Sequence, residues 1–150
     1  MSVAHGTWTV TRTYPHPRQA VFAAWADPAV KAAWFDLSGD TPSEYQGDFR
    51  VGGVETLRVT DSEGRSLTYD GQYRDIVDDQ RIVTTYEMGV DGRITSVSVA
   101  TVELSPVSDG TQLTYTEQGA FLDELDDAAA RRSGLDTQLE RLAGVLDQPH

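Results

Sequence analysis

Residues 135–146 read LDTQLERLAGVL, and leucine recurs there at positions 135, 139, 142 and 146. This spacing of four, three and four residues aligns the leucines along one stripe of an α-helix. The opposite face of the helix is expected to carry four polar residues: Gln138, Glu140, Arg141 and Asp147. The helix begins near Asp126, or later if Ser133 to Asp136 is its capping box, and Pro149 stops it. The sequence therefore predicts a long amphipathic C-terminal helix with one apolar face to bury.

Six strand-like runs precede this helix, each bounded by residues that favour turns. The runs cover Glu44–Phe49, Val54–Thr60, Leu67–Val77, Arg81–Val90, Arg93–Leu104 and Thr111–Gln118. One of the turns between them is Asp91-Gly92, a pair that favours a tight hairpin. Consecutive strands joined by short turns predict an antiparallel meander. Gly71 stands inside one run, and we expect it to mark a bulge that bends the sheet.

The N-terminal part adds one strand and two short helices. Thr7 to Tyr14 alternates in character and is expected to form a strand. Pro17 suits the first position of a helix, where its missing N–H is harmless. Asp27-Pro28 suits the N-cap and the first position of a second helix, which runs to about Trp34.

This order of elements predicts an α+β protein with a helix-grip fold, in a single domain that spans residues 1–150. A curved antiparallel sheet of six or seven strands would wrap around the long C-terminal helix, with the two short helices after the first strand. One helix cannot fill the concave face of so wide a sheet. We therefore expect a cavity for a small molecule between the helix and the sheet.

Charge and hydropathy exclude several classes of partner. The chain carries 12 basic against 24 acidic residues, a formal net charge of −12. This balance argues against nucleic acid and against an anionic membrane surface. No apolar stretch approaches the roughly 20 residues that cross a bilayer, and no apolar run follows a basic segment at the N-terminus. We expect a cytoplasmic protein without a nucleic-acid or membrane partner.

The residue types that hold metals and cofactors are scarce. Cysteine is absent, and the three histidines, His5, His16 and His150, are scattered. No histidine pair has metal-ligand spacing, and thiolate sites are excluded. The acidic groups Asp78-Asp79 and Asp123–Asp127 lack the spacing of a calcium loop. No nucleophile elbow or phosphate-binding loop occurs either. We expect no metal and no cofactor.

Several segments resemble those of one known family, in the same order along the chain. They include VFAAWADP at 21–28, FRVGG at 49–53, GQYRDIV at 71–77, GTQLT at 110–114 and TEQGAFLD at 116–123. Through them the chain resembles the SRPBCC or START-like superfamily, which includes the birch pollen allergen, START lipid-binding domains and aromatic polyketide cyclases. Within it, the chain resembles the family named after the C-terminal domain of the heat-shock protein 90 ATPase activator. The resemblance implies a helix-grip fold with a hydrophobic cavity.

Glu117 is the one candidate for chemistry. Leu113, Tyr115 and Glu117 share a face of the last strand by alternation. If that face is concave, Glu117 points into the cavity, where burial would raise its pKa. It could then bind a polar atom of a ligand or act as an acid or base. The alternative is a structural role, in which Glu117 contacts the loop at Gln118 or forms a salt bridge to an arginine such as Arg50, Arg74 or Arg93.

Aromatic residues are expected to form the walls of the cavity, because tyrosine offers an apolar ring with a polar tip. The residues expected to bind a ligand are Trp34, Phe49, Tyr69, Tyr73, Tyr86, Met88, Tyr115, Glu117, Phe121, Leu135 and Leu139. For each aromatic residue the alternative is ordinary packing in the core.

Three functions remain open. The first is binding of an apolar, aromatic or lipid-like small molecule, and the lack of a His–Asp pair or a carboxylate pair favours it. The second is a cyclase-like or dehydratase-like enzyme that uses Glu117 or a cavity tyrosine. The third is a chaperone-associated stress-response protein. The third is weakened because the eukaryotic activator has a separate N-terminal domain, for which 150 residues leave no room. We also expect a homodimer, because homodimers are the commonest oligomers. No feature of the sequence itself points to one.

Overall fold

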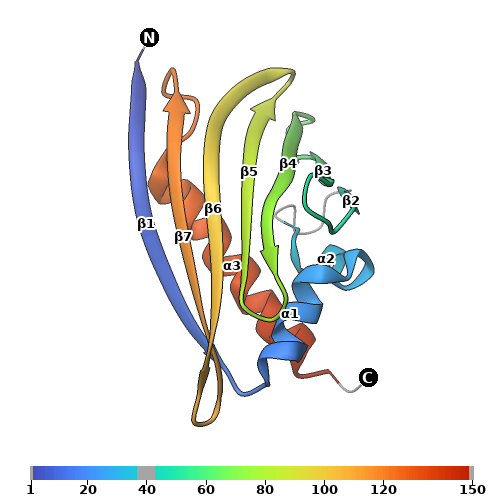
Figure 1. The fold of residues 1–150 in the computed structure, drawn as a ribbon. Helices are drawn as coiled ribbons and strands as arrows, with labels where there is room; N and C mark the ends of the chain where they lie inside the picture. The colour runs from blue at the N-terminus through green and yellow to red at the C-terminus, as the bar shows by residue number, and fades with distance from the viewer. Residues whose placement is uncertain (1, 37–42, 149–150) are drawn as a thin grey trace.

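The computed structural model describes residues 2–36 and 43–148, which form one seven-stranded antiparallel sheet and three helices (Figure 1). The strands are β1 (Val3–Tyr14), β2 (Ser43–Gly47), β3 (Val54–Thr60), β4 (Ser66–Val77), β5 (Arg81–Val90), β6 (Arg93–Val107) and β7 (Gly110–Leu122). The helices are α1 (Arg18–Ala26), α2 (Pro28–Trp34) and α3 (Ala128–Leu146).

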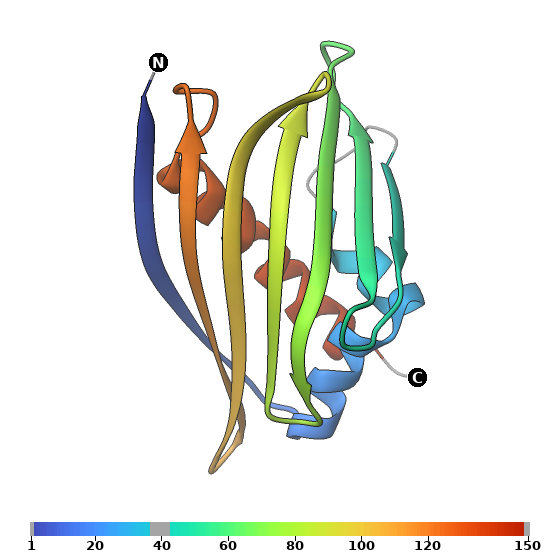
Figure 2. The same ribbon diagram turned by 45° about the horizontal axis from the view of Figure 1, so that its top comes forward.

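The strand order β1-β7-β6-β5-β4-β3-β2 keeps β2 to β7 as neighbours in chain order and returns β1 to the edge beside β7. The sheet is curved, and α3 runs diagonally across its concave face while α1 and α2 lie at one end of α3 (Figures 1 and 2). The predicted α+β helix-grip fold is confirmed. Because β1 and β7 pair along their whole length, the first and last strands together form one margin of the sheet.

Helix α3 buries a stripe of side chains against the sheet. The buried residues are Leu135, Gln138, Leu139, Leu142 and Leu146. The predicted leucine stripe is therefore confirmed, but Gln138 was wrongly placed on the polar face. It lies three residues after Leu135 and is only 6% exposed, because positions i and i+3 share a helix face.

The ends of α3 also differ in part from the expectation. The side chain of Asp127 caps the helix by accepting from the backbone N–H of Ala130 at 2.8 Å. The start near Asp126 is thus confirmed, and the alternative capping box at Ser133 to Asp136 is wrong because these residues lie inside the helix. Pro149 lies outside the described residues.

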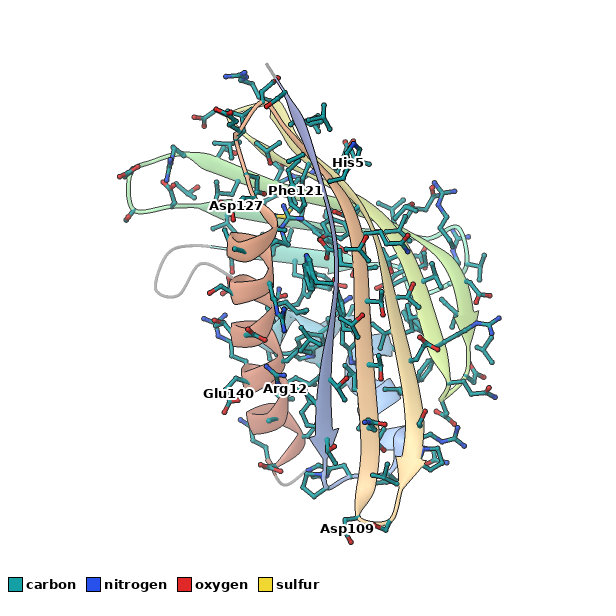
Figure 3. The ribbon with its side chains drawn as sticks, turned by 90° about the vertical axis from the view of Figure 1, so that its left-hand side faces the viewer. His5, Arg12, Asp109, Phe121, Asp127 and Glu140 are labelled. Atoms are coloured by element: carbon teal, nitrogen blue, oxygen red, sulfur yellow. The ribbon has the colours of Figure 1, made fainter. Side chains whose placement is uncertain are left out.

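Strand β1 holds α3 at two points along its length. Arg12 reaches the helix, where its Nη2 donates to Asp136 Oδ1 at 2.7 Å (Figure 3). The hydroxyl of Tyr14, which is buried, donates to the backbone carbonyl of Leu139 at 3.0 Å. These contacts fix the position of the helix above the sheet margin.

The two short helices form as predicted, with small shifts. Pro17 is the N-cap of α1 rather than its first residue. Asp27 caps α2 by accepting from Ala29 N at 3.0 Å, with Pro28 in the first turn. The rings of Trp25 and Trp34 meet edge to face at 4.7 Å, which joins the two helices.

Gly71 does not mark a bulge, contrary to the expectation. The register of β4 against β5 shifts between Tyr73 and Asp75 instead. At Gly71 an added Cβ would meet the hydroxyl oxygen of Tyr69 at 2.9 Å. Glycine is required here because the Tyr69 side chain lies across this position.

A pair of substitutions in α3 tests this packing. Leu139 is 1% exposed, so Leu139→Ala is expected to lower the free energy of unfolding by about 2–5 kcal/mol. Gly144 has no atom within 4 Å of an added Cβ, so Gly144→Ala is expected to raise it by up to about 1 kcal/mol through helix propensity. Urea unfolding measures both. Equal stability of Leu139→Ala and the parent would contradict the packing described.

Candidate functional site

A cavity of about 210 Å³ lies between α3 and the concave face of the sheet. Its apolar walls come from strands β3, β5 and β6 and from α3. These wall residues are Leu57, Ile82, Met88, Ala100, Val102 and Leu135. Two buried carboxylates, Glu55 on β3 and Glu117 on β7, also line it, each within its own cluster of tyrosines.

The predicted site residues divide into two groups. Six line the cavity: Tyr69, Tyr86, Met88, Tyr115, Glu117 and Leu135. Five do not: Trp34, Phe49, Tyr73, Phe121 and Leu139. Whether any of them binds a ligand stays a prediction.

The five residues outside the cavity wall pack in the surrounding core. Trp34 is fully buried against Trp25, and Phe49 contacts Phe22 and Tyr73 edge to face. Phe121 lies near the start of α3 (Figure 3), 5.5 Å below the guanidinium of Arg131. For Trp34, Phe49 and Phe121 the alternative of ordinary core packing describes the contacts observed.

The first cluster surrounds Glu55, which is 1% exposed, and we call it the Glu55 cluster. Oε1 of Glu55 accepts from Lys31 Nζ at 2.7 Å, from the Tyr45 hydroxyl at 2.6 Å and from the Tyr73 hydroxyl at 2.8 Å. Oε2 accepts from the Tyr69 hydroxyl at 2.6 Å. The cluster thus joins α2 to strands β2, β3 and β4.

The charge of Glu55 is well compensated. Burial raises the pKa of Glu55, but Lys31 and the hydrogen bonds outweigh burial and hold that pKa below its usual value. Burial and the adjacent carboxylate raise the pKa of each of the three tyrosines. At neutral pH Glu55 is therefore ionised, and the three tyrosines keep their protons.

The second cluster surrounds Glu117, which is also 1% exposed, and we call it the Glu117 cluster. Oε1 of Glu117 accepts from the Tyr86 hydroxyl at 2.7 Å and from the Tyr115 hydroxyl at 2.9 Å. Oε2 has a long contact of 3.5 Å, to Arg131 Nη1. The buried Ser98 hydroxyl also acts on Glu117 and lowers its pKa, but it forms no hydrogen bond of ordinary geometry with the described residues. Unlike Glu55, Glu117 is therefore left with one weakly bonded oxygen.

Arg131 divides its donors among several partners in the Glu117 cluster. Nη1 donates to the Tyr86 hydroxyl at 2.9 Å, and Nη2 donates to Ser96 Oγ at 2.7 Å and to the carboxylate of Asp126. Burial raises the pKa of Glu117, and the opposing effects of Tyr86 and Arg131 are too weak to offset it. The predicted direction of this pKa shift agrees with the structure.

Glu117 pairs with an arginine, as the structural alternative expected, but the arginines named for it were wrong. Arg50 pairs with Asp48 at 2.7 Å, and Arg74 donates to Thr85 Oγ1 at 2.8 Å. Arg93 is exposed at the start of β6. The partner is Arg131, because the first turn of α3 lies over the concave face of the sheet, one helical turn before Leu135.

Sequence reasoning missed Lys31, Glu55 and Arg131. A usable signal existed for Glu55, which alternates with the inward-facing Leu57 and Val59 on β3. Arg131 continues the helical stripe that the leucines define. Lys31, the one lysine of the chain, gave no such signal because α2 is a helix of only seven residues.

Substitutions at the buried ion pair test the Glu55 cluster. Glu55→Gln leaves Lys31 buried without its counter-ion and is expected to lower the free energy of unfolding by about 3–5 kcal/mol. The double variant Lys31→Met/Glu55→Gln removes both charges and is expected to recover part of this loss. Urea unfolding measures both variants. If the double variant were the less stable of the two, the assigned ion pair would be wrong.

The pH dependence of stability tests the Glu117 cluster. The folded protein keeps the Glu117 proton above pH 4.5, the usual pKa, whereas the unfolded chain releases it. The folded state thus binds more protons there, and the contribution of Glu117 to stability falls as the pH rises through its folded pKa. Glu117→Gln lacks this dependence, so its stability relative to the parent is expected to rise over that interval.

Urea unfolding at several pH values measures this difference. Glu87→Gln, on the exposed face of β5, is the control and is expected to follow the parent. A constant difference between the parent and Glu117→Gln would contradict the raised pKa.

The described residues carry neither a membrane span nor a metal cluster. None of their helices combines the length and the hydropathy needed to cross a bilayer. Nor do these residues include three histidine, aspartate or glutamate side chains grouped so that they could hold a metal ion.

Residues 15–147 match the family model described as Activator of Hsp90 ATPase homolog 1-like protein. A solved protein from Rhizobium loti is 47% identical, with a TM-score of 0.88 and coverage of 97% of this chain and 99% of the other. One from Rhizobium leguminosarum is 36% identical, with a TM-score of 0.94 and coverage of 99% and 98%. No curated protein matches the chain. The chain belongs to the family of Activator of Hsp90 ATPase homolog 1-like proteins.

Proposed function

We propose that the chain binds a small apolar or aromatic molecule in the cavity between α3 and the sheet. The observation that carries this proposal is the unfilled volume of about 210 Å³ among apolar walls. Protein cores are close-packed and rarely leave voids much larger than a water molecule. An open space of this size, placed where the fold brings polar groups beside apolar walls, is typical of a binding site.

The volume limits the size of the ligand. A cavity of about 150 Å³ with apolar walls accepts a benzene molecule, so this cavity suits a compound of one or two rings. Tyr69 and Tyr86, whose ring centroids are 4.8 Å apart, offer aromatic surface for such a ring. A flat aromatic compound therefore fits the walls better than a long acyl chain.

Acid or base chemistry by Glu117 is a second candidate, and the raised pKa of this carboxyl beside the cavity favours it. Native mass spectrometry of freshly purified protein separates the two candidates. A co-purified molecule of unchanged mass after incubation supports binding, whereas a changed mass that Glu117→Gln abolishes supports catalysis.

Filling the cavity tests the binding proposal. Ala100 on β6 is buried and lines the cavity, so Ala100→Leu places a larger side chain in the open space. We expect its affinity for toluene, measured by calorimetric titration, to fall about tenfold or more, which corresponds to about 1.4 kcal/mol. Its stability should change little, because the added atoms enter an existing void.

Ala129→Leu is the matched control. Ala129 is exposed on α3, so this substitution adds the same atoms outside the cavity. Its toluene affinity is expected to equal that of the parent. Failure of toluene to bind the parent protein, or equal binding by Ala100→Leu, would overturn the proposed function.

A further inference from the structure

We propose that the ligand is an aromatic compound with a hydrogen-bond donor, such as a phenol, whose hydroxyl binds Glu117 Oε2, and that the cavity rejects carboxylates. This inference rests on the proposed function and adds the polarity of the ligand to its size. Three observations carry it: the open acceptor at Glu117, the engagement of every charged donor, and the charge of the cavity wall.

The open acceptor is Oε2 of Glu117. A carboxylate oxygen has about two lone-pair sites, and full burial without hydrogen bonds is costly. Oε1 receives two tyrosine hydroxyls, but the one hydrogen bond to Oε2 is the 3.5 Å contact with Arg131, and the nearby Ser98 hydroxyl forms none of ordinary geometry with the described residues. A hydroxyl or amine on a molecule inside the cavity would satisfy this oxygen.

The charged donors around the cavity are already engaged within the described part of the chain. Lys31 donates to Glu55 at 2.7 Å and lies 4.4 Å from the centre of the Phe35 ring. Arg131 donates to Tyr86, to Ser96 and to Asp126. Neither cation is therefore available to hold the carboxylate of a ligand.

The tyrosine hydroxyls are engaged in the same way. The Tyr69 proton goes to Glu55, and the protons of Tyr86 and Tyr115 go to Glu117. The tyrosine hydroxyls of the cavity wall thus already donate to carboxylates of the protein. A ligand that brings a further acceptor finds none of these protons free.

The formal charge of the wall adds to this preference. Two cations, Lys31 and Arg131, face three carboxylates, Glu55, Glu117 and Asp126, which leaves a net charge of −1. A bound anion would be repelled by this charge and would also lose its hydration. A neutral donor avoids both costs.

Two polar side chains that line the cavity form no hydrogen bond with the described residues, and both are neutral. Gln138 is 6% exposed, lines the cavity and forms no side-chain hydrogen bond with the described residues. It lies seven residues after Arg131, about 10 Å further along α3. The indole N–H of Trp25, which also lines the cavity, has no partner among these residues. Such groups suit a neutral polar substituent better than a charged one.

The experiment compares four single-ring probes by calorimetric titration at neutral pH: toluene, phenol, anisole and benzoate. Toluene and phenol have the same size and differ in the hydroxyl. Anisole keeps the oxygen but has no proton to donate. We expect phenol to bind about tenfold or more tightly than anisole, because phenol can donate a hydrogen bond to Oε2 and anisole cannot. We expect benzoate to bind most weakly.

Glu117→Gln replaces the open acceptor with an amide and is expected to lower the ratio of phenol to toluene affinity about tenfold. It should raise the affinity for benzoate, since the amide of glutamine carries no charge and can donate a hydrogen bond to a carboxylate. Glu87→Gln, which removes a charge on the exposed face of β5, should leave both unchanged. Thermal unfolding confirms that each variant is folded, and the comparison of phenol with anisole in the parent protein needs no variant.

The outcomes separate the two proposals. If toluene does not bind the parent protein, the proposed function fails. If toluene binds but anisole or benzoate binds as tightly as phenol, the cavity binds ligands and only the preference for a donor is wrong. An unchanged ratio of phenol to toluene affinity in folded Glu117→Gln would also overturn the role of Oε2.

Discussion

One long helix covers a seven-stranded concave sheet, and the rest of the interior is arranged around the space that this leaves. Helix α3 crosses the sheet diagonally, and α1 and α2 lie at one end of it (Figures 1 and 2). Tyrosines on β4, β5 and β7 extend from the sheet toward the space. Because a buried hydroxyl needs an acceptor, these rings require carboxylates among them, and Glu55 and Glu117 serve that purpose. Each carboxylate in turn needs a cation, which a helix provides: Lys31 from α2 and Arg131 from α3.

The two clusters differ in how fully their donors and cations compensate the buried carboxylate. Glu55 has four close donors, one of them the ammonium of Lys31, and its pKa is lowered. Glu117 has two close donors, and its cation is 3.5 Å away and shared with Asp126, so burial raises its pKa. The Glu55 cluster therefore joins elements of the fold, while the Glu117 cluster retains bonding capacity that can be directed at a ligand.

The repeating patterns of the sequence predicted most of the fold. Alternation located the strands, and the leucine spacing located α3, because both patterns follow from burial of one face. Alternation also placed Glu117 inside. The same rule would have found Glu55, which alternates with Leu57, although a charged residue in a strand is usually exposed. Gln138 was missed for the same reason, since a polar residue within a leucine stripe is usually solvated.

The cavity wall was predicted less well than the fold, because aromatic composition does not separate a wall from the core behind it. Trp34 and Phe49 pack on other aromatic rings, whereas Tyr69 and Tyr86 face the open space. What distinguishes them is the position of α3, which depends on contacts between distant segments such as Arg12 with Asp136 and Tyr14 with Leu139.

Arg131 connects the cavity to the segment that enters α3. It bonds Asp126 in that segment as well as the hydroxyl of Tyr86. Two residues of the same segment, Asp123 and Glu124, have positive φ angles of 53° and 60°, a conformation that costs free energy in residues other than glycine. The contacts of Arg131 help to hold this segment in place. A guanidinium committed in this way cannot also compensate Glu117 fully, and the incomplete bonding of Oε2 is thus a consequence of how α3 is anchored.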